Sequence, residues 1–209
     1  MARDTRTRIL VNSLLLFNEQ GVSKTTTNDI ADEIDISPGN LHYHFRKKSD
    51  IVDALMAEFQ ADARKVLQTP DGEQVSIDEF WVFLHLLLEF TAAYRFMMRD
   101  MEGLAADYPK AGKALTHFAK GLMSVFELYL IGLSRSHVLT MRLEDVRLVG
   151  RNLAVIALFS ERFDMLVDCV RDADEAALRV AQSILSALKP FAAGGAAKQL
   201  EELATHYDE

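Results

Sequence analysis

The stretch that decides the fold runs from Thr25 to Phe45 and reads TTTNDIADEIDISPGNLHYHF. Its first half predicts a short helix, because Thr26 can cap the free amides of the first turn and Asp29, three residues later, completes a capping box. The buried side of this helix is expected to consist of Ile30, Ala31 and Ile34.

The second half of the stretch predicts another short helix with its own start signal. Ser37 can cap it, and Pro38 stands at the first helical position, where its missing N–H costs no hydrogen bond. Leu41 and Phe45 lie one turn apart and are expected to face inward, which leaves an outward face formed by Asn40, His42, Tyr43 and His44. A helix-turn-helix inserts a helix of this kind into the major groove of DNA, so the stretch predicts sequence-specific DNA binding.

Helices on either side complete a compact N-terminal module. Apolar residues at helical spacing predict a helix over residues 5–20 that stops at Gly21. A further helix over about 48–67 is expected to lead out of the module. We expect a three-helix DNA-binding domain in residues 1–50 and a second domain in residues 51–209.

The remainder of the chain carries helical patterns and no strand pattern. A capping box at Ser76 to Glu79 begins a helix that we expect to continue to about Phe96, and a short helix then ends near Tyr108. Further helices are expected over about 110–133, 143–170, 174–191 and 197–207, with a loop over 134–140. The helix that starts at Ser76 is apolar around most of its circumference, which indicates burial by several neighbours or the lining of a cavity. The fold class is therefore all-α.

The distribution of charge is more informative than its total. The formal net charge is −8, but residues 1–50 hold seven basic and seven acidic residues, so the negative excess belongs to residues 51–209. Two basic clusters flank the helix-turn-helix: Arg3, Arg6 and Arg8 before it, and Arg46, Lys47 and Lys48 after it. These clusters fit contacts to DNA phosphates and fit plain solvated charge equally well.

Other function classes find little support in the sequence. The apolar runs at 80–90 and 122–133 are too short to cross a bilayer and the N-terminus lacks a signal-peptide core, so we expect a cytoplasmic protein without membrane association. Cys169, the single cysteine, reads as a small buried side chain rather than a nucleophile. The histidines are scattered without metal-ligand spacing, and we expect no catalytic site, no cofactor and no metal.

A longer ordered pattern runs through the N-terminal module. It consists of Ile9, Leu10, Phe17 and Gly21, followed by the runs TNDIA (27–31), ISPGNL (36–41) and YHF (43–45) and by Lys48. With this pattern the module resembles the TetR family of bacterial transcription regulators. A looser similarity, through residues 36–41, 80–85 and 94–96, is to the PhaD-like subgroup, which regulates polyhydroxyalkanoate gene clusters. His42 departs from the family, which commonly has Tyr at this position.

The resemblance implies a homodimer with two N-terminal reading heads and a C-terminal helical domain for ligand binding and dimerisation. Such a dimer binds an inverted-repeat operator in double-stranded DNA, by default as a repressor, and a small apolar or acyl-type effector releases it. The last two long helices, here 143–170 and 174–191, are implied to pair with their copies. The apolar surface for this pairing is expected from Leu148, Leu153, Ile156, Phe159, Phe163, Leu166, Val167, Leu178, Ile184 and Leu188.

The same resemblance directs attention to two sets of site residues. Asn40 can form a bidentate pair with adenine and Lys48 can meet a phosphate. The expected DNA-binding set is Thr26, Thr27, Asn28, Ser37, Pro38, Gly39, Asn40, His42, Tyr43, His44 and Lys48. The expected effector pocket uses soft and aromatic side chains, for which plain core packing is the alternative: Trp81, His85, Leu88, Tyr94, Met97, Met101, His117, Phe118, Met123 and Phe126.

Two other functions stay open at this stage. One is a helical small-molecule-binding protein whose N-terminal module no longer binds DNA, which His42 and the acidic residues Asp29, Asp32 and Glu33 would favour. The other is a regulator that works without a ligand, including an activator of the PhaD-like kind.

Overall fold

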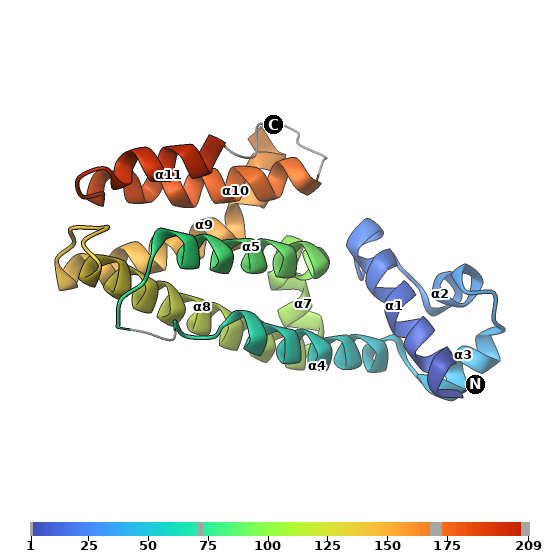
Figure 1. The fold of residues 1–209 in the computed structure, drawn as a ribbon. Coiled ribbons are helices and arrows are strands. Elements are labelled where there is room, and N and C mark those ends of the chain that lie inside the picture. The colour runs from blue at the N-terminus through green and yellow to red at the C-terminus, as the bar shows by residue number, and fades with distance from the viewer. Residues whose placement is uncertain (1, 71–72, 168–172, 206–209) are drawn as a thin grey trace. The chain divides into compact units, whose positions relative to one another are not determined.

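A computed structural model of the chain describes residues 2–70, 73–167 and 173–205 (Figure 1). Apart from an isolated bridge between Leu139 and Ala192, the regular structure of these residues is helical, which confirms the all-α fold. The helices form two compact units, one of Met1–Ala63 with Ala93–His117 and one of Arg64–Ala92 with Phe118–Glu209. The predicted boundary near residue 50, between a DNA-binding domain and a second domain, stays a prediction.

The first unit contains the N-terminal helices, drawn in blue in Figure 1, and a later group of short helices. Its elements are α1 (Ala2–Gln20), α2 (Thr27–Glu33), α3 (Pro38–His44), most of α4 (Lys48–Val66), α6 (Arg95–Arg99), α7 (Met101–Asp107) and the start of α8 (Pro109–Arg135). Side chains from four of these helices are completely buried and form its core: Ile9, Phe17, Ile30, Leu41, Ile51, Leu55 and Phe59.

The helix expected to run unbroken to about Phe96 instead ends at Ala93, so that prediction is wrong. The side chain of Asn18 on α1 explains the break, because it takes over the backbone groups at this point. Its Nδ2 donates to the carbonyl of Ala93 at 2.8 Å, and its Oδ1 accepts from the amide of Phe96 at 3.0 Å. Tyr94 accordingly leaves helical geometry (φ −112°, ψ 36°), and α6 starts at Arg95.

Two further contacts tie α1 to α6. The Arg99 guanidinium donates to the carbonyl oxygen of Asn18 at 3.3 Å, and the rings of Phe17 and Phe96 lie 5.6 Å apart. A second break follows at Asp100, whose carboxylate accepts from the amide of Gly103 and caps α7. The short helices α6 and α7 thus owe their boundaries to hydrogen bonds that helical periodicity does not reveal.

The second unit contains α5 (Ile77–Ala93), the larger part of α8, α9 (Leu143–Val167), α10 (Ala173–Leu188), the 3₁₀ turn η1 (Lys189–Phe191) and α11 (Ala196–Thr205). The helix α8 extends to Arg135, so the expected loop over 134–140 lies instead at 136–142. The C-terminal helices are close to the expected ones, although 168–170, including Cys169, and 206–207 fall outside the described residues. The helices α10 and α11 pack side by side (Figure 1), and Gln182 on α10 donates to the carbonyl of Ala204 at 3.2 Å.

Aromatic rings on α5 and α8 form the core of the second unit. Phe83 stacks on Tyr129 with ring centroids 4.5 Å apart, and Phe126 meets Phe83 edge-on at 5.5 Å. Phe80 is fully buried beside these rings. Among the described residues, no helix is long and apolar enough to span a membrane.

Candidate nucleic-acid interface

The first helix of the helix-turn-helix begins with the capping box expected from the sequence. Thr26 Oγ1 accepts from the amide of Asp29 at 3.1 Å, and the Asp29 carboxylate accepts from the amide of Thr26 at 2.7 Å. The Thr26 amide and, after it, the Thr26 hydroxyl hold the pKa of the Asp29 carboxyl below its ordinary value of 3.8. The negative charge of Asp29 therefore lies at the start of α2, where it interacts favourably with the helix dipole.

The turn between α2 and α3 closes in a defined geometry. The amide of Ile36 donates to the carbonyl of Ala31 at 3.0 Å and that of Asp35 to Asp32 at 3.2 Å, which is the Schellman pattern. Asp35 adopts a left-handed conformation (φ 53°), where Gly is the usual residue and Asp is tolerated. This turn sets the direction in which α3 leaves α2.

The helix α3 buries one side and exposes the other, as its pattern predicted. Ser37 Oγ accepts from the amide of Asn40 at 3.2 Å, and Pro38 occupies the first turn. Leu41 is completely buried and Phe45 nearly so. Every residue from Ser37 to Asn40 is exposed, so the start of α3 is accessible to a partner.

The outward side chains of α3 are not equally free. Tyr43 is 81% exposed, and the half-buried His44 ring meets it edge-on at 5.2 Å. His42 is exposed, and its Nδ1 lies 3.3 Å from the carbonyl oxygen of Arg46. Because a carbonyl oxygen only accepts, Nδ1 carries the proton in this contact, which does not use Nε2.

Several of the basic residues stabilise the N-terminal helix-turn-helix module, here called the head, through contacts within it. The Arg6 guanidinium lies over the Phe45 ring at 4.8 Å, and Arg8 donates to the carbonyl of Ile34 at 2.8 Å. Lys48 Nζ donates to the carbonyls of Val22 at 2.7 Å and Thr25 at 3.0 Å. Lys48 therefore has a structural role, and its phosphate contact stays a prediction, whereas Arg46 and Lys47 are exposed beside α3.

The expected pocket residues of the first unit differ widely in accessibility. Tyr94 is buried, donates to the Asp62 carboxylate at 2.8 Å and meets Phe59 edge-on, and its burial, then Asp62, raises its pKa. Met97 is buried and Met101 half-buried, but His117 is exposed.

The expected pocket residues of the second unit are mostly core. Phe118 and Phe126 are buried in aromatic contacts, Leu88 is buried, and Trp81 and Met123 are half-buried. His85 is exposed beside Trp81, so the alternative of plain core packing is wrong for this residue. Two cavities of this unit, of about 670 and 370 Å³, are lined by none of the ten expected residues.

The apolar surface expected for dimerisation is concentrated on α9. Its exposed residues include Leu148, Val155, Phe159, Phe163, Leu166 and Val167, which recur at helical spacing. Three residues expected on this surface are buried inside the unit instead: Leu153, Ile184 and Leu188. That part of the prediction is wrong, because α9 and α10 pack against each other and use these side chains themselves.

Comparison with known proteins identifies the family of this chain. A family model described as bacterial regulatory proteins of the tetR family matches residues 9–55, and one described as a bacterial transcriptional repressor, TetR, matches residues 58–200. The chain belongs to the TetR family. The two matches cover the head and the C-terminal helices separately, so the TetR assignment does not depend on the helix-turn-helix alone.

Individual TetR relatives agree with this assignment. The probable HTH-type transcriptional regulator YttP of Bacillus subtilis (strain 168) is 30% identical over 69 residues, 33% of each chain. The probable acrEF/envCD operon repressor of Escherichia coli (strain K12) is 33% identical over 67 residues, 32% of this chain and 30% of that protein. The chain thus spans about a third of the length of these relatives, which are transcriptional regulators and not enzymes.

A solved structure matches over nearly the whole length. The crystal structure of a TetR-family transcriptional regulator from Marinobacter aquaeolei VT8 has a TM-score of 0.87 and 26% identity, covering 97% of this chain and 98% of that one. The TetR fold therefore extends through α11. The PhaD-like subgroup stays a prediction.

Asn18 is the residue of the first unit that sequence reasoning missed. It lies in the last turn of α1, three residues before Gly21, and nothing in its local pattern announces a partner 75 residues away. Only the tertiary contacts show that the Asn18 side chain joins α1 to the end of α5 and the start of α6.

Proposed function

We propose that this TetR-family protein is a dimeric regulator that reads an inverted-repeat operator in double-stranded DNA and acts as a repressor. The outward face of α3 carries the proposal, since Asn40, His42 and Tyr43 are exposed on a helix whose other side is anchored by Leu41. Two copies of α3 would enter successive major grooves about 34 to 36 Å apart.

The contacts divide into base reading and backbone positioning. Asn40 would pair with an adenine edge, and His42 would offer Nε2 to a neighbouring base or phosphate. Thr26, Thr27 and Asn28 at the start of α2, Ser37 to Gly39 at the start of α3, and Tyr43, His44 and Lys48 would contact sugar and phosphate. Exposure of Arg46 and Lys47 beside α3 supports additional phosphate contacts.

The proposed dimer forms through the exposed apolar face of α9. Burying Phe159, Phe163 and Leu166 against a second copy removes from water side chains that a monomer would leave exposed. A symmetric dimer is also what an inverted repeat requires, because each half-site is then read by an identical head.

Release by a small apolar or acyl-type effector is the proposed switch. The effector would act by binding better to a dimer whose heads do not fit the operator. The Asn18 contacts support a mechanical link, because any shift of α6 must move α1 or break two hydrogen bonds. The ten expected pocket residues remain the candidates for effector contacts, and a PhaD-like activator would differ only in where its operator lies.

Selection from random-sequence DNA by the purified protein tests the proposal. We expect enrichment of one inverted repeat, a binding stoichiometry of one dimer per site, and affinity that falls steeply with salt. Recovery of no preferred sequence at low salt would refute DNA reading and favour the helical small-molecule-binding alternative.

A further inference from the structure

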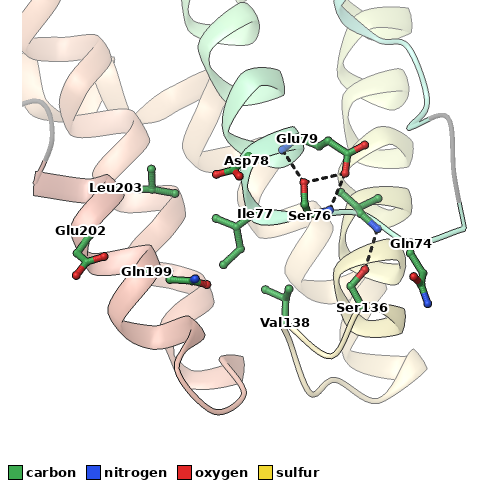
Figure 2. A pocket seen from close by; sticks show the side chains of 11 residues that line it. Gln74, Ser76, Ile77, Asp78, Glu79, Ser136, Val138, Gln199, Glu202 and Leu203 are labelled. Atoms are coloured by element: carbon green, nitrogen blue, oxygen red, sulfur yellow. Dashed lines mark hydrogen bonds between the residues drawn. The ribbon is translucent and has the colours of Figure 1, made fainter.

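The larger cavity of the second unit does not indicate a ligand class. It lies between the start of α5, the loop after α8, and α11 (Figure 2). Its charged side chains are exposed, and two of its carboxylates already have partners, since Glu79 accepts from Ser76 and Glu202 pairs with Lys198. The break between α5 and α6 in the fold is more informative.

The residues around this break do not account for it. Residues 77–102 include neither glycine nor proline, and the run FTAAYRFMMR (90–99) is compatible with an uninterrupted helix. Tyr94 nevertheless leaves helical geometry, and the amide of Met97 donates to its carbonyl at 2.9 Å instead of to that of Ala93, the α-helical partner. The break is therefore imposed by a contact from outside this segment.

The carboxamide of Asn18 replaces two backbone bonds that a continuous helix would make here. In such a helix the carbonyl of Ala93 would accept from the amide of Met97, and the amide of Phe96 would donate to Ala92. In the structure the Ala93 carbonyl accepts from Asn18 Nδ2 at 2.8 Å, and the Phe96 amide donates to Asn18 Oδ1 at 3.0 Å. Both forms satisfy these two backbone groups, so neither form is excluded by an unpaired polar group.

The broken form also places two aromatic side chains against two different helices of the first unit. Tyr94 donates to Asp62 at 2.8 Å and meets Phe59 edge-on, both on α4. Phe96 is 2% exposed and its ring lies 5.6 Å from that of Phe17 on α1. Helical geometry at Tyr94 would change its ψ by roughly 80° and redirect the chain after it, so these contacts would not all persist.

Helix α1 connects the break with the DNA-reading helix. Asn18 lies in its last turn. Near its start, the Arg6 guanidinium lies over the Phe45 ring at the end of α3, and Arg8 donates to the carbonyl of Ile34 at the end of α2. A rigid helix with contacts at both ends transmits a displacement from one end to the other, so the state of the break reaches α3.

We propose that the junction of α5 and α6 is a two-state element and that Asn18 is the positioning residue that selects its state. With Asn18 bonded to Ala93 and Phe96, the helix is broken and α1 holds the head in the form that reads DNA. With Asn18 released, the helix runs unbroken over residues 77–99 and α1 is no longer held at its end. The effect on DNA rests on the proposed function, whereas the exchange between the two helix forms does not.

The helix exchange is tested without DNA on the purified full-length protein, through the ¹³Cα chemical shift of Tyr94. Asn18→Leu removes both hydrogen bonds at nearly the same side-chain size, so we expect the Tyr94 shift to move into the helical range. Asn18→Asp keeps the acceptor for Phe96 and loses the donor to Ala93, so the shift should move about half as far; if only one variant folds, it decides alone. A Tyr94 shift that stays unchanged, or that moves to the random-coil value, would overturn the proposal. Because no DNA is used, this result stands even if the unmodified protein binds no operator and the proposed function fails.

Operator affinity then tests the effect on the head, with a glycine rescue. We expect Asn18→Leu to weaken binding to the selected operator at least tenfold. Adding Ala93→Gly should recover about fivefold, because residue 93 is interior in the continuous helix and last in the broken one, so glycine disfavours the continuous form. Adding Glu89→Gly is the matched control, since this exposed position one turn earlier is interior in both forms and should give no recovery. If both glycines leave binding equally weak, Asn18 only stabilises the fold and the proposal fails.

Discussion

Two outward faces of this protein are exposed to a similar degree and differ in chemistry. Tyr43 on α3 is 81% exposed and stands among polar side chains, whereas Leu166 on α9 is 80% exposed and continues an apolar row with Phe159 and Phe163. When no partner is present, water can hydrogen-bond to the polar side chains of the α3 face. Apolar surface of the α9 face has no such compensation, and its exposure to water costs about 25 cal/mol per Å² of free energy. The α3 face therefore suits a transient partner, and the α9 face suits a permanent one.

Breaking the α9 face should give the largest effect. In the double variant Phe159→Asp, Phe163→Asp, two carboxylates would have to be buried without partners, so we expect the dimer dissociation constant to rise at least about 10³-fold. Light scattering coupled to size exclusion would show a monomer, and operator affinity would fall because one head reads only a half-site.

A matched control is available on α5. Val82 is also an exposed apolar residue on a helix, so Val82→Asp makes the same chemical change away from α9 and should leave a dimer. If Val82→Asp dissociates the protein and the α9 variant does not, the permanent partner binds another face.

Lys48→Ala should give the next largest effect, because this residue serves the head twice. Loss of its hydrogen bonds to Val22 and Thr25 should lower the free energy of unfolding by roughly 2 kcal/mol. Loss of a phosphate contact should weaken all DNA sequences alike and reduce the salt slope by about one. Chemical denaturation and salt-dependent binding measure the two roles separately.

Lys47→Ala is the comparison for that variant. Lys47 is exposed, so its removal should lower the salt slope without a comparable loss of stability. An unchanged salt slope for Lys48→Ala, together with lost stability, would show that Lys48 only holds the loop of residues 22–25.

The sequence predicted most of the head because its signals are local. The capping box at Thr26, the Ser37 cap and the inward positions Leu41 and Phe45 each depend on residues within a few positions of one another. The break at Tyr94 depends on Asn18, which is 75 residues distant from Ala93, and no local pattern contains that information.

The same distinction explains the errors in the C-terminal unit. The ten apolar residues predicted for the dimer surface include buried ones, because periodicity shows which side chains are apolar and not which neighbour covers them. Leu153, Ile184 and Leu188 are covered by the protein's own helices, and Phe159 and Phe163 are not. The cavity beside α11 was missed altogether, since its walls come from three segments far apart in the sequence.

Asn40→Ala should have a smaller and more selective effect on the α3 face. A bidentate pair to one base contributes about 1 to 3 kcal/mol, so preference at one operator position should relax while affinity for other positions is kept. Binding to a panel of single-base operator variants measures this. An equal loss for every operator would place Asn40 on the backbone, with the dimer unaffected in either case.

The smallest expected effect is a loss of stability at low pH, which should affect the start of α2 and not the α9 face. Asp29 has a pKa below 3.8 in the folded protein, so its contribution to stability is complete above 3.8 and is lost as pH falls through the folded value. The stability difference between the unmodified protein and Asp29→Asn should therefore shrink below about pH 4, as measured by amide exchange in α2. Thr26→Val removes the hydroxyl that accepts from the Asp29 amide and that also lowers the Asp29 pKa, so its loss should be larger above about pH 4 and should keep a pH-independent part below it. The exposed row of Phe159, Phe163 and Leu166 on α9 consists of uncharged side chains, so acid should loosen the start of α2 while the dimer persists. Simultaneous loss of both would mean that head and dimer unfold as one unit.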